Sequence, residues 1–258
     1  MGYQAAYSNT TGTGVTLLGA TAGYFLTGNY NTGVGNQALF NTTGSDNVGV
    51  GNNALIVNTS GSYNTGIGRD ALQANTTANY NTALGYLAGY ANTTGEENLF
   101  LGLGAGYNST TGSYNTYVGR GLSKAAGSEM TTGSKNTILG AYTGNQNGLD
   151  IRTSSNNIVL SDGDGNPAFH INSNGDINAE RFSSLNTPYT GDLNNLDKSG
   201  FYRSENSNSN NPTYAYYAVV VFGNCSNVVT QIATVLQGTT TYVRSFNTAW
   251  SAWQRLDT

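Results

Sequence analysis

The sequence is poor in charged residues, cysteine and proline. Only 9% of its 258 residues are charged, against about a quarter in ordinary globular domains. The single cysteine, Cys225, excludes an intrachain disulfide framework and a cysteine-based zinc site. With three prolines and no Gly-X-Y period, the chain is not collagen-like. Its stability therefore does not rest on disulfide bonds.

The sequence also lacks long hydrophobic runs and basic character. Its mean hydropathy is −0.35, and no apolar run approaches the ~18 residues of a membrane-spanning helix. We therefore predict no membrane insertion. The net charge of −4 argues against nucleic acid as a partner, because nucleic-acid binding requires a basic face. Aromatic residues make up 11% of the chain, which is atypical of disordered proteins.

A repeat organises the first 160 residues. Asparagine followed by a short apolar segment recurs every 16 to 21 residues, at Asn31, Asn47, Asn64, Asn81, Asn98, Asn115, Asn136 and Asn156. Three places after each asparagine stands an aliphatic residue, at Val34, Val50, Ile67, Leu84, Leu101, Val118, Leu139 and Val159. Glycine follows it in seven of the eight copies, and alanine recurs at Ala38, Ala54, Ala71, Ala88 and Ala105. Such self-similarity indicates a repeat architecture.

The length of the unit predicts a narrow β-solenoid. Two strands of about five residues and two turns consume roughly 17 residues, one coil of such a fold. Stacked coils place equivalent residues about 4.8 Å apart, so the asparagines would form a ladder of side-chain amides. The glycines suit a tight bend or the close approach of another backbone.

One coil is too narrow for an ordinary core. It offers an aliphatic column and an alanine column, and we infer that one fills the coil while the other faces a partner chain. The simplest such assembly is threefold. GYQAAY at 2–7 matches GYLAGY at 85–90, the second half of a repeat. We therefore expect the rest of a longer fibre to lie N-terminal to residue 1.

The repeats resemble those of a known family. NTGVGNQAL at 31–39, NVGVGNNAL at 47–55 and NTGIGRDAL at 64–72 resemble the head repeats of YadA-type trimeric adhesins. Those heads are left-handed parallel β-rolls of three chains. Similar runs, such as NTALGYLAGY at 81–90, are common in phage tail fibres. The resemblance implies a homotrimeric β-roll and does not identify a receptor.

The periodicity ends near Ser161. Residues 161–187 predict a connector of short β-hairpins around the strand AFHI. Residues 188–258 contain five β segments and predict a small β-sandwich: GFYRS, YAYYAVVVF, NVVTQIATVL, TYVRSF and AWSAWQRL. DLNNL with GFY, and YVRSFN with WSAWQRL, resemble the opening and closing motifs of phage tail-fibre tip domains. The resemblance implies a receptor-binding knob.

Catalytic and metal-binding candidates are few. His170, the only histidine, is interpreted as structural, although a threefold axis could bring three copies around an ion. Asp162 and Asp164 resemble the start of a calcium loop, but Ser173 stands where the twelfth-position glutamate belongs. Without a histidine to activate them, the serines do not form a Ser–His triad. We predict no enzyme activity and no cofactor.

Receptor-binding candidates lie in the predicted knob. Uncharged sugars are held by aromatic faces together with fixed amide and hydroxyl groups. The candidates of these types are Asn210, Asn211, Tyr214, Tyr216, Asn224, Asn227, Asn247 and Trp250, and Arg244 could meet a sugar carboxylate or pair with an acid.

These observations predict an all-β homotrimer: a parallel β-solenoid (β-roll) shaft at 1–160, a connector at 161–187 and a β-sandwich knob at 188–258. We expect a phage tail fibre in the virion that attaches to a bacterial surface glycan, such as lipopolysaccharide or capsule, or to a surface protein. The alternatives are a trimeric autotransporter adhesin of a bacterium and a glycan-depolymerising tailspike.

Overall fold

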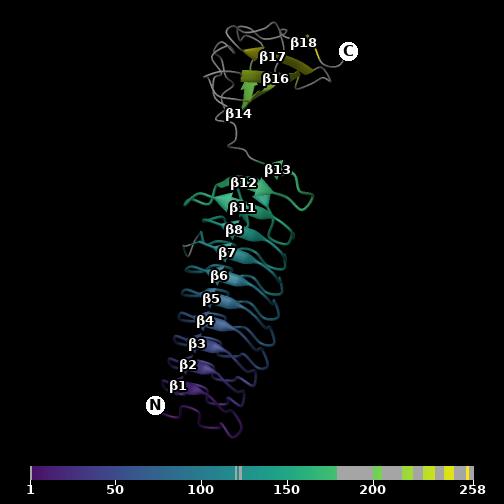
Figure 1. Ribbon diagram of the computed structural model, residues 1–258. Coiled ribbons are helices and arrows are strands. Elements are labelled where there is room, and N and C mark those ends of the chain that lie inside the picture. Colours follow the sequence, from purple (N-terminus) through teal and green to yellow (C-terminus); the bar gives the residue numbers. More distant parts are fainter. Residues whose placement is uncertain are drawn as a thin grey trace. The chain divides into compact units, whose positions relative to one another are not determined.

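The computed structural model describes residues 2–119, 121, 124–178, 200–204, 217–222, 229–235, 241–246 and 254–255. The described residues form an all-β protein without helices (Figure 1). The chain divides into two compact units, Met1–Asn178 and Ala179–Thr258.

The first unit is a parallel β-solenoid of about eight turns, as the repeat predicted. Each coil contributes one short strand, and the strands stack in parallel, as Figure 1 shows. They are β1 (Thr16–Leu18), β2 (Thr32–Val34), β3 (Val48–Val50), β4 (Thr65–Ile67), β5 (Thr82–Leu84), β6 (Leu99–Leu101), β7 (Thr116–Val118), β8 (Thr137–Leu139) and β11 (Ile158–Ser161). Equivalent residues of successive repeats pair directly, as Thr65 does with Thr82.

The prediction of two strands per coil is wrong. The second half of each coil runs through turns, and the reason lies in its burial pattern. Ala38 and Leu39 are adjacent and both fully buried, whereas adjacent residues of a strand point to opposite faces. Positive φ angles at Gln37 (56°) and Leu39 (54°) turn the backbone away from the β conformation. This segment still bonds to the next coil, since the Leu39 amide donates to the Ala54 carbonyl at 3.0 Å.

The core of the solenoid is a set of stacked columns inside the coil. The alanine column fills the interior, together with the leucines that follow it and the middle residue of each strand. The largest fully buried side chains are Tyr117, Tyr142, Phe100, Leu26, Leu39, Leu55, Leu72, Met130 and Ile138. A single chain thus has a continuous hydrophobic core.

The predicted asparagine ladder is present and buried. The backbone N–H of Asn64 donates to Asn47 Oδ1 at 2.9 Å. The side-chain Nδ2 of Asn64 donates to the Ala78 carbonyl at 2.8 Å. Asn64 thus bonds to the coil before it and to the corner of the coil after it. A second buried ladder, Asn58, Asn75 and Asn92, escaped the sequence analysis.

The glycine column marks close approach between backbones. Gly35 has a φ of 139°, and a Cβ there would lie 2.4 Å from the Gly51 carbonyl oxygen. Both features exclude side chains, so the predicted role of this column is confirmed.

The last repeat was aligned one residue too early. The structure places Asn157 in the ladder, because its backbone amide donates to Asn136 Oδ1 at 2.9 Å. Asn156 instead occupies the preceding corner with a φ of 62°, like Lys135. Val159 accordingly pairs with Ile138 inside the coil.

The C-terminal end of the solenoid departs from the parallel pattern. A hairpin of β9 (Asn145–Gln146) and β10 (Leu149–Asp150) interrupts the coil between β8 and β11. After β11 the chain reverses into β12 (Pro167–Ile171), which contains the predicted AFHI strand and pairs antiparallel with β11. β13 (Ile177–Asn178) then pairs antiparallel with β12.

The second unit contains a five-stranded antiparallel sheet in sequential order. Its strands are β14 (Gly200–Ser204), β15 (Tyr217–Phe222), β16 (Val229–Val235), β17 (Thr241–Phe246) and β18 (Gln254–Arg255). Each of the first four predicted β segments contains a strand, and the fifth, AWSAWQRL, is a strand at Gln254–Arg255 within its described residues. A sandwich built on this sheet stays a prediction.

Candidate functional site

Most predicted receptor-binding residues lie outside the described residues. These are Asn210, Asn211, Tyr214, Tyr216, Asn224, Asn227, Asn247 and Trp250. Arg244 lies in β17, where its backbone pairs with Gln231 of β16. Their roles stay predictions based on the sequence.

The structure gives His170 a structural role. Its side chain is buried, and Nε2 lies 3.0 Å from Asn157 Oδ1. Because that oxygen only accepts, Nε2 carries the proton and donates it. Burial lowers the pKa of His170 below its usual value of 6.5. His170 thus terminates the asparagine ladder as a neutral hydrogen-bond donor.

Asp162 stabilises the predicted turn through its side chain, whereas Asp164 takes part through its backbone amide. Asp162 Oδ1 accepts hydrogen bonds from the backbone amides of Asp164 and Asn166, at 3.0 and 2.9 Å, and Oδ2 accepts one from Asn166 Nδ2. Among the described residues, no cluster of three or more His, Cys, Asp or Glu side chains could hold a metal ion.

The outer face of the solenoid sheet is an uncharged, partly apolar surface. The first and third residues of each strand point outward, while the middle residue points into the core. The third-position column is the aliphatic column of the repeat, and Leu84 and Leu101 in it are 45% and 37% exposed. We call the outward residues of β1–β8 the outer sheet face. They are threonines and aliphatic residues only: Thr16, Leu18, Thr32, Val34, Val48, Val50, Thr65, Ile67, Thr82, Leu84, Leu99, Leu101, Thr116, Val118, Thr137 and Leu139.

A row of exposed tyrosines borders the outer sheet face. Tyr30, Tyr63, Tyr80 and Tyr114 each precede a ladder asparagine and have positive φ angles. The rings of Tyr63 and Tyr80 stack with centroids 5.0 Å apart and planes 4° apart. This row was not predicted from the sequence, although the tyrosines have the same spacing as the asparagines that follow them.

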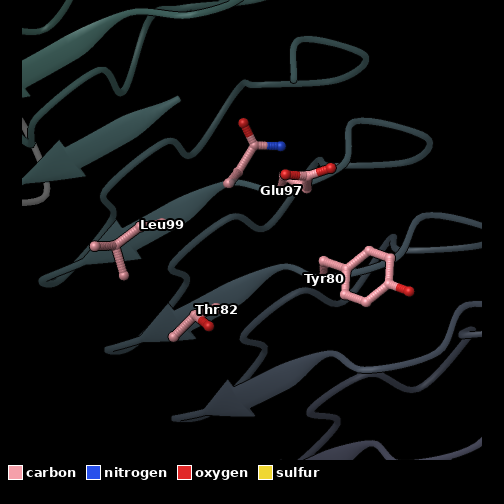
Figure 2. Close-up of a pocket in the computed structure, with 5 residues that line it drawn as sticks. Tyr80, Thr82, Glu97 and Leu99 are labelled. Carbon is pink, nitrogen blue, oxygen red and sulfur yellow. The ribbon is translucent and has the colours of Figure 1, made fainter. Parts of the chain in front are cut away.

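The row is interrupted at Asp46 and at Glu97, which take the same position in their coils. A shallow open groove forms at Glu97. Figure 2 shows its lining: Thr82 and Leu99 stand on neighbouring strands, and Tyr80 and Glu97 lie on the turns that lead into them. The groove has a volume of about 530 Å³. Because Thr82 and Leu99 belong to the outer sheet face, the groove is continuous with that face.

Comparisons of the chain with protein-family models, with curated proteins and with solved structures found no match. The described part of the chain contains no apolar helix long enough to span a bilayer.

Proposed function

We propose that this protein is the distal part of a bacteriophage tail fibre, which attaches the virion to a bacterial surface glycan, such as lipopolysaccharide or capsule, without catalysis. The observation that carries the proposal is the combination of a regular solenoid that has one uncharged outer face with a separate β-sheet unit that follows it in the sequence. In this proposal the solenoid is the shaft and the C-terminal unit is the knob.

The bonding between coils supports the role of the first unit as a stiff shaft. Every coil is joined to its neighbours by strand pairing, by the asparagine ladder and by backbone bonds between the turns. Threonines add further links, since Thr76 Oγ1 donates to the Thr93 carbonyl at 3.0 Å. A bend of the shaft would break several of these bonds at once.

The outer sheet face supports trimer formation through the shaft. Monomeric proteins rarely expose a continuous apolar surface of this kind, and such surfaces mark interaction sites. The face repeats along β1–β8 without a charged residue, so equivalent faces of three chains could pack around a common axis. The core described above is complete within one chain, so this packing would add an interface and would not complete the core.

Receptor recognition is assigned to the knob on the basis of its tip-domain motifs. Aromatic and amide side chains suit uncharged sugars, and the acidic chain would gain nothing from attraction to anionic envelopes. Three knobs on each fibre, and several fibres on each particle, would raise the avidity of weak individual sites.

A pair of variants tests the shaft interface. Leu101→Asp places three like charges in the interface and should convert the trimer to monomers. Val57→Asp is the matched control, because Val57 is 39% exposed and lies outside the outer sheet face. Light scattering would measure the mass of each variant. An intact trimer of Leu101→Asp would exclude this face as the interface.

Cell binding tests the knob. The double variant Tyr214→Ala/Trp250→Ala should lose binding to the host bacterium while the trimer persists. Tyr80→Ala, which removes an exposed shaft tyrosine, is the control and should bind normally. If the double variant binds as well as the unmodified fibre, the assignment of recognition to these residues is wrong.

A further inference from the structure

The solenoid changes where its coils become longer. Successive ladder asparagines are 16 or 17 residues apart up to Asn115, but the two following intervals are 21 residues. In the last interval the added residues form the β9–β10 hairpin. In repeat proteins, insertions within a repeat map to loops on one face, which is often the binding face.

An open groove of about 690 Å³ lies beside this hairpin. Its lining comes from four successive levels of the solenoid. The first level contributes Ala91, and the other three contribute the main polar residues, Asn108, Thr110, Glu129, Thr131, Asp150 and Arg152. Four stacked levels span about 14 Å, a length that suits an extended chain rather than a small ion. No residue of the outer sheet face lines the groove. It therefore stays open when that face is covered by partner chains.

The hairpin side of the groove is held rigidly. The buried Tyr142 hydroxyl lies 2.8 Å from the Leu149 carbonyl oxygen and 2.9 Å from that of Gly144, and it donates between them. Arg152 Nε and Nη2 donate to the two oxygens of Asp150 at 3.0 and 2.8 Å. These bonds lower the pKa of Asp150 below its usual value. The groove thus presents an Asp150–Arg152 ion pair whose side chains are half exposed and within reach of a ligand.

The other polar groups of the groove have unused hydrogen-bonding capacity. Within the described residues, the side chains of Asn108 and Glu129 make no hydrogen bond inside the chain. The hydroxyls of Thr110 and Thr131 donate to carbonyls of the next coil, and their oxygens remain free to accept. Arg152 uses two of its five N–H groups on Asp150 and keeps three. The lining therefore offers both hydrogen-bond donors and hydrogen-bond acceptors to a ligand.

We propose that this groove binds neutral pyranose units of a polysaccharide alongside the shaft. Each sugar hydroxyl both donates and accepts, which matches the mixed set formed by Glu129, Asn108 and Arg152. Two carboxylates face one guanidinium here, so an anionic glycan would meet net repulsion. A purely cationic ligand would leave the free donors of Arg152 unused. The site is additional to the knob and gives the fibre a second contact with the same class of glycan.

The test uses the full chain with its knob site removed, Tyr214→Ala/Trp250→Ala, against an immobilised panel of neutral and acidic bacterial polysaccharides. This background should retain weak binding to a neutral polysaccharide. Adding Glu129→Gln or Asn108→Ala should reduce that binding about tenfold, the effect of losing one ligand hydrogen bond. Glu97→Gln and Arg69→Ala, on other parts of the solenoid, should leave it unchanged.

Three results would overturn the proposal: no neutral polysaccharide bound by the knob-deficient chain, binding that survives both groove substitutions, or preference for acidic polysaccharides. Thermal melting of each variant checks that the solenoid is folded. Failure of the knob assignment gives a different result, since the knob-deficient chain would then bind as strongly as the unmodified fibre.

Discussion

The solenoid has regular coils of 16 or 17 residues and, after Asn115, lengthened coils of 21 residues. The two kinds of coil differ in how their side chains are arranged. In the regular coils, from β1 to β7, many side chains stack on a residue of the same type, as Tyr63 stacks on Tyr80. In the lengthened coils that follow β7, different residue types meet: Glu129, Asp150 and Arg152 line one groove. Repetition favours stiffness because it satisfies every backbone group in the same way. Departure from repetition brings unlike functional groups together, which a binding site needs.

The same contrast applies to hydrogen bonding. The asparagines of the main ladder use their side chains for hydrogen bonds to neighbouring coils, as Asn47 and Asn64 do. In the lengthened coils, the Glu129 side chain makes no hydrogen bond to another residue in the described part of the chain. We therefore expect substitutions in the regular coils to affect stability and those in the groove to affect binding.

The largest predicted effect comes from the substitution Asn81→Asp. Asn81 is fully buried, and its Nδ2 donates to the Gly95 carbonyl at 2.8 Å. A carboxylate there would face a carbonyl oxygen and carry a buried charge, a loss of about 3–5 kcal/mol of unfolding free energy. Burial would raise the pKa of the new carboxyl group, so the loss should shrink as the pH falls. Chemical denaturation at pH 7 and at pH 4 measures both effects. Equal stability of the variant and the unmodified protein at pH 7 would place this column in solvent.

A pair of glycine substitutions sharpens the comparison. Gly68 has a φ of 135°, and a Cβ there would lie 2.3 Å from the Gly85 carbonyl oxygen. Gly68→Ala should therefore cost about 3 kcal/mol, from backbone strain and from the forced separation of two coils. Gly163, in the turn after β11, has nothing within 4 Å of its added Cβ, so Gly163→Ala should change stability by less than about 1 kcal/mol. Thermal melting of both variants measures the two losses of stability. Equal losses would contradict the claim that close backbone approach excludes a side chain at Gly68.

The smallest predicted effect concerns the pH dependence of the end cap. Burial depresses the pKa of His170 in the folded state, so the unfolded chain binds its proton more tightly. The stabilisation is therefore complete above pH 6.5, and it is lost as the pH falls below 6.5 and through the lower folded-state pKa. His170→Gln keeps a donor for Asn157 Oδ1 and should flatten this part of the stability curve. A melting temperature that falls identically in both proteins between pH 7.5 and pH 5 would assign the dependence to other groups.

The regular coils were predictable from sequence because their columns repeat. The period of Asn31 to Asn136 gave the strand register, and Gly35 and its equivalents marked the tight approach of neighbouring backbones. The number of strands per coil was not predictable from the period. It depends on the positive φ of residues such as Leu39, which lets two adjacent side chains point inward.

The lengthened coils were less predictable because local sequence leaves their alignment open. Asn156 and Asn157 are chemically identical, and only the bond from Asn157 to Asn136 shows which one continues the ladder. The groove beside the β9–β10 hairpin could not be predicted from the sequence either, because Glu129 and Arg152 are 23 positions apart, which is not the repeat interval. The one available signal was the increase of the interval from 17 to 21 residues at Asn115.

The absolute mass of the protein in solution tests the central claim, that the outer sheet face joins three chains into a fibre. Light scattering after size exclusion would measure it directly. A homotrimer of 27.0 kDa chains has a mass of about 81 kDa and should elute as an elongated particle. A mass of 27.0 kDa across the accessible concentration range would contradict the account, and the outer sheet face would then belong to a self-contained monomer.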